Sequence, residues 1–162
     1  MWNKNKSIML TQLIVRACYV FLAVAAIGVP ILLKSGGYRQ LWISIEADDY
    51  VIYSLFAVVP AGYAALICLD KLLINVKKEA VFNEKNVKLL RIISWACFYA
   101  GFVGVTLFSI IFIQTSYLAV TLFPLAILAL AIAEMFMGLV VRVVKNVFEA
   151  AIEIKEENEL TI

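Results

Sequence analysis

Residues 92–133 read IISWACFYAGFVGVTLFSIIFIQTSYLAVTLFPLAILALAIA and contain no charged side chain. A helix rises about 1.5 Å per residue and the hydrocarbon core of a membrane is about 30 Å thick, so about 20 apolar residues cross it once. The stretch has 42 residues, enough for two crossings. We predict that it reverses at its only polar cluster, Gln114-Thr115-Ser116. Because lipid cannot satisfy the backbone of an open strand, both crossings must be helices.

Two further apolar segments precede this hairpin. The whole chain of 162 residues is 64% hydrophobic with a mean hydropathy of +0.96, whereas soluble domains are about 45–50% apolar. Lipid is therefore the solvent for much of its surface. We predict a single all-α domain over residues 1–162, an antiparallel four-helix transmembrane bundle with cytoplasmic helix extensions. The predicted spans are 8–33, 50–73, 92–113 and 118–141.

The first apolar segment follows two lysines, Lys4 and Lys6, and a signal peptide also begins with positive charges before its apolar region. Arg16 interrupts it, however, and it continues to Leu33, beyond the typical apolar region of about 7–15 residues. We interpret it as an uncleaved first span.

Basic residues set the expected orientation. Lys and Arg accumulate in the cytoplasmic loops of membrane proteins. Placing both termini in the cytoplasm puts eleven basic residues inside and two outside. The inside residues are Lys4, Lys6, Lys71, Lys77, Lys78, Lys85, Lys88, Arg91, Arg142, Lys145 and Lys155, and the outside residues are Lys34 and Arg39. Residues 34–49 are then an outer loop, and 74–91 and the tail 142–162 are cytoplasmic.

Composition also argues against catalysis. The chain has no histidine, the usual general base and the commonest metal ligand. Cys18, Cys68 and Cys97 all lie in apolar stretches, where cysteine as a small buried hydrophobe is favoured over a thiolate metal site. No catalytic, metal or cofactor residue is predicted, and the chain is not expected to be an enzyme.

Arg16 and Glu134 are the unusual charges within spans, where ionisable groups are costly and often functional. Both lie about 10–12 Å from the cytoplasmic ends of their spans. We expect them to form an intramembrane ion pair, which Asp70 could join. The alternative is that Arg16 snorkels alone to the headgroups and Glu134 faces a water-filled crevice.

Pro60 and Gly62 lie in the middle of the second span. Proline frees a backbone carbonyl and can kink a helix, so these residues are a candidate hinge or cavity site. Small residues also let helices approach closely, and ordinary close packing is the favoured interpretation.

The cytoplasmic segments contain two structural signals. Asn83 followed by Glu84 predicts a helix start, because Asn caps helices and an acidic residue suits the first turn. After residue 141, apolar residues recur at spacings of three and four, which predicts an amphipathic helix. Its end is a candidate docking tail made of Glu156, Glu157, Asn158, Glu159, Leu160, Thr161 and Ile162.

The segments VFNEKNVKLLR (residues 81–91) and EENELTI (residues 156–162) resemble motifs of the YoaS-like family of small four-span bacterial membrane proteins of unknown function. The resemblance covers essentially the whole chain. The family usually ends Asn-Asp-Leu-Thr-Ile, and Glu159 keeps the charge of that Asp. Members are often encoded beside a small Cro-like helix-turn-helix regulator. The resemblance implies the bacterial plasma membrane and a cytoplasmic transcriptional regulator as partner, and it supplies no catalytic residue.

The sequence therefore favours a small regulatory or adaptor protein that presents its inner loop and C-terminal helix to a cytoplasmic partner. The alternative is a transporter, channel or immunity-type protein that acts within the bilayer, and homo-oligomerisation is open in either case. The basic inner loop is explained by topology and anionic lipid, so no direct contact with nucleic acid is expected.

Overall fold

The computed structural model describes residues 4–35, 47–78, 82–114 and 122–160. It contains the helices α1 (Lys4–Ser35), α2 (Ala47–Lys77), α3 (Glu84–Gln114) and α4 (Leu122–Leu160). Each is long and apolar enough to cross a membrane. The predicted all-α fold with four transmembrane helices is confirmed, and the chain is a multi-pass membrane protein.

The predicted start of α3 is also confirmed. The side-chain oxygen of Asn83 accepts a hydrogen bond from the backbone N–H of Lys85 at 3.1 Å, so Asn83 caps the helix that begins at Glu84. At its other end α3 stops at Gln114, the first residue of the predicted turn. Residues 115 and 116 lie outside the described part of the chain.

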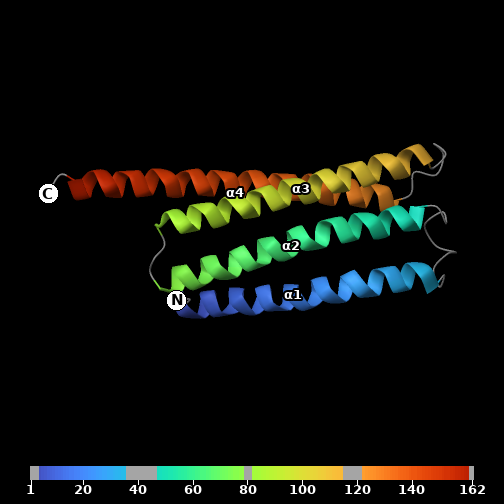
Figure 1. Cartoon of the computed structure of the whole chain (residues 1–162), viewed down its shortest axis with the longest axis horizontal. Coiled ribbons are helices and arrows are strands. Elements are labelled where there is room, and N and C mark those ends of the chain that lie inside the picture. The colour runs from blue at the N-terminus through green and yellow to red at the C-terminus, as the bar shows by residue number, and fades with distance from the viewer. Residues whose placement is uncertain (1–3, 36–46, 79–81, 115–121, 161–162) are drawn as a thin grey trace.

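The helices contact one another in chain order. α1 packs against α2, α2 against α3 and α3 against α4, whereas no described Cα atom of α1 lies within 8 Å of one in α4. Both chain termini lie at one end of the molecule (Figure 1), here called the terminal end. The fold is thus an open row of antiparallel helices in which α1 and α4 are not neighbours.

Small residues set the closest contact, between α3 and α4. A Cβ atom built on Gly104 would lie 2.8 Å from Cβ of Ala131, and one on Gly138 would lie 3.2 Å from Cβ of Cys97. The hydroxyl of Ser94 donates to the carbonyl of Gly138 at 2.9 Å. These contacts leave no room for side chains at the glycines, which is how small residues bring membrane helices together.

Polar contacts fix the other two pairs. The hydroxyl of Tyr63 donates to the Tyr19 carbonyl at 3.5 Å, and the two rings stack 6.0 Å apart between α1 and α2. The side-chain amide of Asn75 donates to Oδ1 of Asn86 at 2.6 Å between α2 and α3. Asn86 is fully buried, with 0% of its surface exposed.

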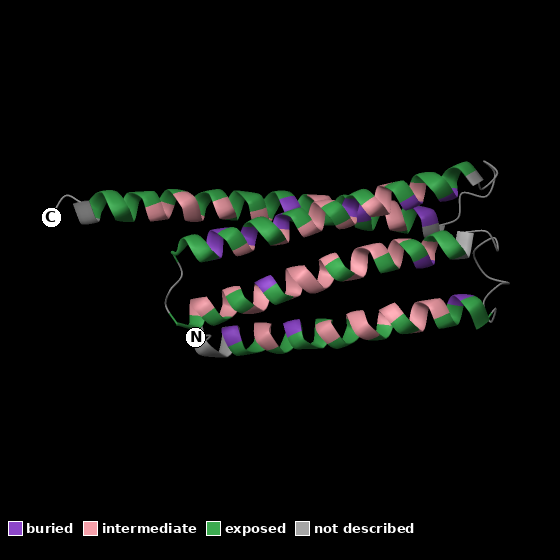
Figure 2. Cartoon of the chain, viewed as in Figure 1, coloured by how far each residue is buried: buried purple, intermediate pink, exposed green. Residues whose placement is uncertain are grey.

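Most of every helix surface remains exposed or half-buried (Figure 2), and many of the exposed side chains are large and apolar. In water such a surface would be unstable. In lipid it needs no further cover, because the hydrocarbon is as apolar as the side chains.

The contacts between helices show which residues share a depth. Asn75 faces Asn86, so Asp70, five residues from Asn75, is level with Arg91. Ser94 faces Gly138, so Arg91 is in turn level with residues 141–142.

Facing residues also give the depth of α1 relative to α2. Gly62 faces Leu22, and six residues from each lie Cys68 and Arg16. Tyr63 also contacts Tyr19, so Arg16 lies about 3–6 Å deeper in the bundle than Asp70. Charged residues of the other three helices form one level, the charge belt, made of Asp70, Lys71, Arg91 and Arg142.

The charge belt lies one membrane thickness from the opposite helix ends. From the belt to those ends is 23 residues in α2 and α3 and 20 in α4. At about 1.5 Å per residue these distances are about 30–35 Å, which match a hydrocarbon core of about 30 Å.

Candidate functional site

Helix α4 is the longest element, with 39 residues, and it extends past the other helices at the terminal end (Figure 1). Because Ser94 faces Gly138, the start of α3 at Glu84 is level with about residue 148. Residues 151–160, here called the α4 projection, therefore extend about 15 Å along α4 beyond the level at which α3 begins. The projection carries four glutamates and one lysine, and is strongly acidic.

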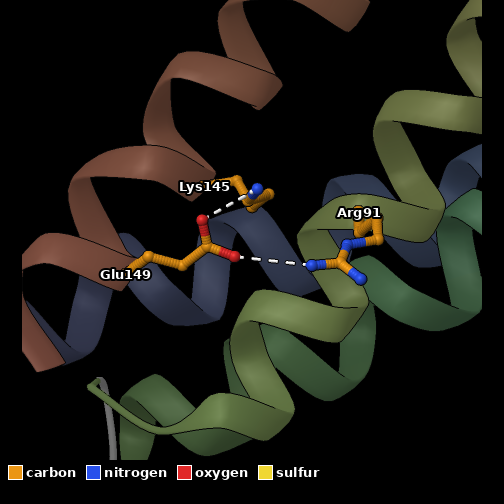
Figure 3. Close-up of polar contacts among 3 residues, drawn as sticks. All are labelled: Arg91, Lys145 and Glu149. Carbon is orange, nitrogen blue, oxygen red and sulfur yellow. Dashed lines mark hydrogen bonds and ion pairs between the residues drawn. The ribbon is translucent and has the colours of Figure 1, made fainter. Parts of the chain in front are cut away.

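Glu149 anchors the base of this projection to α3 (Figure 3). Its carboxylate lies 2.8 Å from Nζ of Lys145, one turn earlier on α4, and 3.5 Å from Nη2 of Arg91 on α3. The hydrogen bond from Lys145, with the charge of Arg91, lowers the pKa of Glu149 below its ordinary value. Glu149 thus ties α4 to α3.

A groove of about 360 Å³ separates the first turns of α3 from α4 on the same side as Glu149. Its floor has the apolar residues Val87 and Ile152, and the other lining residues are charged. They are Glu84, Lys88, Arg91, Glu149, Glu153 and Glu156. The groove and the projection together form one acidic surface, which is the candidate functional site.

The apolar stripe of the C-terminal helix is only partly covered. The ring of Phe148 lies 5.5 Å from that of Phe82, just before α3. In contrast, Val147 and Ile154 are exposed, each by 60%. Ile154 lies on the projection and leaves an apolar contact among the acidic residues.

The structure describes part of the predicted docking tail. Glu156, Glu157 and Asn158 are helical and exposed on the projection. Glu159 and Leu160 complete α4, and Thr161 and Ile162 lie outside the described residues. The docking role itself stays a prediction.

The structure does not bring Arg16 and Glu134 together. Among the described residues, neither side chain forms an ion pair, and no described Cα atom of α1 lies within 8 Å of one in α4. Spacing along the sequence estimates the depth of a residue in its own helix, but it does not show which helices are neighbours. The ion pair, with Asp70 as a further member, stays a prediction.

Glu134 instead borders an apolar groove of about 280 Å³ within the membrane. All four helices contribute to it, from Val29 on α1 and Ser54 on α2 to Leu107 on α3 and Ala131 on α4. The groove places one carboxyl group among apolar side chains.

At the candidate hinge, α2 runs through Pro60 without a break. A Cβ on Gly62 would lie 3.2 Å from Leu22 of α1, so Gly62 serves close packing between α1 and α2. Cys18, Cys68 and Cys97 are free. In the described part of the chain, no three His, Cys, Asp or Glu residues gather as a metal site would need.

Sequence reasoning missed several of these contacts. The buried Asn75–Asn86 pair has no sequence signal, because both residues lie in a polar segment. The spacing of Lys145 and Glu149, four residues apart, was a readable signal for one ion pair, but it gives no sign of Arg91 as the second partner.

Comparison with known proteins identifies the family of this chain. Searches of curated proteins and of solved structures find no match. The sequence model of the family described as "Protein of unknown function (DUF2975)" matches residues 11–162, nearly the whole chain. The match includes all of α2, α3 and α4, with the groove and the projection. The chain therefore belongs to the DUF2975 family.

Proposed function

We propose that this chain is a small bacterial adaptor that holds a cytoplasmic regulatory protein at the plasma membrane. The α4 projection carries the proposal, since it is an acidic helical segment about 15 Å long that extends beyond the level at which α3 begins. Charge placement supports a cytoplasmic location for this end, and the likeness to YoaS-like proteins supports the bacterial membrane. The proposal assigns no catalysis to the chain.

The chemistry of the projection defines the partner. An acidic helix attracts a basic protein surface and repels the phosphates of nucleic acid. Helix-turn-helix regulators carry such a basic surface, because they bind DNA phosphates. A regulator held by its basic surface on the projection could not occupy DNA at the same time. Such competition would make the membrane protein an inhibitor of that regulator.

The test is recovery of the regulator from membranes. Full-length protein is solubilised in detergent and captured, and helix-turn-helix proteins in the eluate are quantified by mass spectrometry. Glu156→Gln with Glu157→Gln should reduce recovery roughly tenfold, at ~0.5–1 kcal/mol for each exposed charge pair. Deleting residues 158–162 should abolish recovery and leave insertion intact.

The matched control is Lys77→Gln with Lys78→Gln, a second adjacent pair of exposed charges at the same end of the molecule. This variant should recover the regulator as well as the wild type does. Equal recovery by the glutamate variant and the wild type, or capture of no DNA-binding protein by any form, would contradict the proposal.

The apolar groove beside Glu134 favours a second candidate function, in transport, conduction or immunity within the bilayer. A carboxyl group at this depth could bind a cationic or hydrogen-bonding ligand that enters from the lipid. For such a protein, Glu134→Gln should remove the transport, conduction or immunity activity, and Glu156→Gln with Glu157→Gln should leave that activity unchanged. The adaptor proposal expects the opposite pattern.

A further inference from the structure

A second hollow lies between α3 and α4, at the depth of the charge belt. It has a volume of about 200 Å³ and is lined by Arg91, Ser94 and Trp95 from α3 and by Arg142 and Lys145 from α4. Residues three or four apart lie on one face of a helix, so each helix presents its lining residues to the same space. We call this hollow the basic pocket.

The basic pocket holds more positive charge than its neighbours neutralise. Three of its five lining residues are cations, and none is acidic. The one nearby carboxylate, Glu149, contacts Arg91 and Lys145 and lines the acidic groove instead. Arg142 forms no ion pair with any described residue. The Lys145 side chain is only 16% exposed, and its ammonium group shares the Glu149 carboxylate with Arg91, so this one carboxylate does not neutralise the three cations.

A phosphate group matches this donor set. The guanidinium group of arginine binds phosphate through paired hydrogen bonds, and the ammonium group of lysine adds a point charge. Ser94 forms part of the wall, since its hydroxyl already donates to the carbonyl of Gly138.

The surroundings favour a lipid as the source of that phosphate. The charge belt lies at the edge of the hydrocarbon, where headgroup phosphates are found. Trp95 is 64% exposed, as is typical of indoles at this depth. One turn deeper, Tyr99 and Leu139 are exposed and offer an apolar surface to acyl chains. We propose that the basic pocket binds the headgroup of an anionic phospholipid, with its phosphate between Arg91, Arg142 and Lys145.

The experiment measures thermal unfolding of full-length protein in a neutral detergent as phosphatidylglycerol, phosphatidylcholine or inorganic phosphate is added. Wild-type protein should be stabilised by phosphatidylglycerol at concentrations at least tenfold lower than by phosphatidylcholine. Inorganic phosphate should have no comparable effect. Arg142→Gln should weaken the response to phosphatidylglycerol about tenfold, as expected for loss of a charged hydrogen bond. Arg142→Lys, which keeps the charge, should retain most of it.

Lys71→Gln is the matched control, because Lys71 is an exposed cation of the charge belt on α2, outside the basic pocket. It should change the response less than twofold. Equal losses for Lys71→Gln and Arg142→Gln would show attraction to the whole belt and overturn the pocket. Equal stabilisation by inorganic phosphate would overturn the lipid as ligand, and equal stabilisation by the two lipids would overturn the preference for anionic headgroups.

Discussion

Gly101→Leu is expected to destabilise the protein by about 2–3 kcal/mol through overpacking. Gly101 is buried between α3 and α4. A Cβ placed there would lie 2.6 Å from Cγ of Met135 and 2.9 Å from the backbone oxygen of Ala131. The methionine side chain can move, but the backbone oxygen belongs to the body of α4, so the helices must separate. Thermal or denaturant unfolding in detergent measures the loss.

Gly28→Leu is the matched control. Gly28 also lies within a span, on α1, but a Cβ there meets no atom within 4 Å. The same substitution should therefore change stability by less than about 0.5 kcal/mol. If Gly101→Leu is as stable as Gly28→Leu, the contact between α3 and α4 is not as close as described.

Asn86→Leu is expected to cost about 1–3 kcal/mol of stability, because it leaves the half-buried amide of Asn75 without its partner. Leucine has the branching and the number of side-chain heavy atoms of asparagine but is bulkier, so the double variant described below separates the hydrogen bond from the packing. The 2.6 Å bond joins the end of α2 to the first turn of α3. The unfolding measurement in detergent is the same as for Gly101.

Two further variants test whether the lost hydrogen bond causes this loss of stability. Asn146→Leu changes an exposed asparagine on α4 and should be nearly neutral. Asn75→Leu combined with Asn86→Leu should recover part of the loss, since replacing both partners leaves no unpaired amide. A double variant that is less stable than either single variant would contradict this explanation.

Much of the fold follows from the sequence, because membrane thickness imposes a length on each apolar segment. The uncharged residues 92–133 are too long for one span and contain one polar cluster, and α3 ends at Gln114 within it. Asn83 and Glu84 predict the start of α3 because caps act within one turn. Both signals are local, which is why they can be read without neighbouring helices.

The offsets between helices depend on contacts between distant residues and could not be predicted from the sequence. Gly28 and Gly101 look alike in the sequence, yet only Gly101 faces another helix closely. The neighbours of Arg16 could not be predicted either. α1 packs against α2 and not against α4 in the described chain, and no spacing along α1 indicates this.

The candidate site was predicted in part. The amphipathic helix beyond residue 141 was predicted from its spacing, and α4 continues to Leu160. The Arg91–Glu149 contact and the basic pocket both depend on how α3 and α4 are aligned. That alignment is set by Ser94, Gly101 and Gly138, through contacts between residues at least 30 positions apart.

We expect the α4 projection to lie in the cytoplasm, where a regulatory partner can reach it. Labelling single cysteines in a variant without Cys18, Cys68 and Cys97 tests this location, using a thiol reagent that does not cross membranes. In intact cells Gly36→Cys should react and Glu157→Cys should not, and Glu157→Cys should react once the membrane is opened. Reaction of Glu157→Cys in intact cells would place the projection outside and contradict the account.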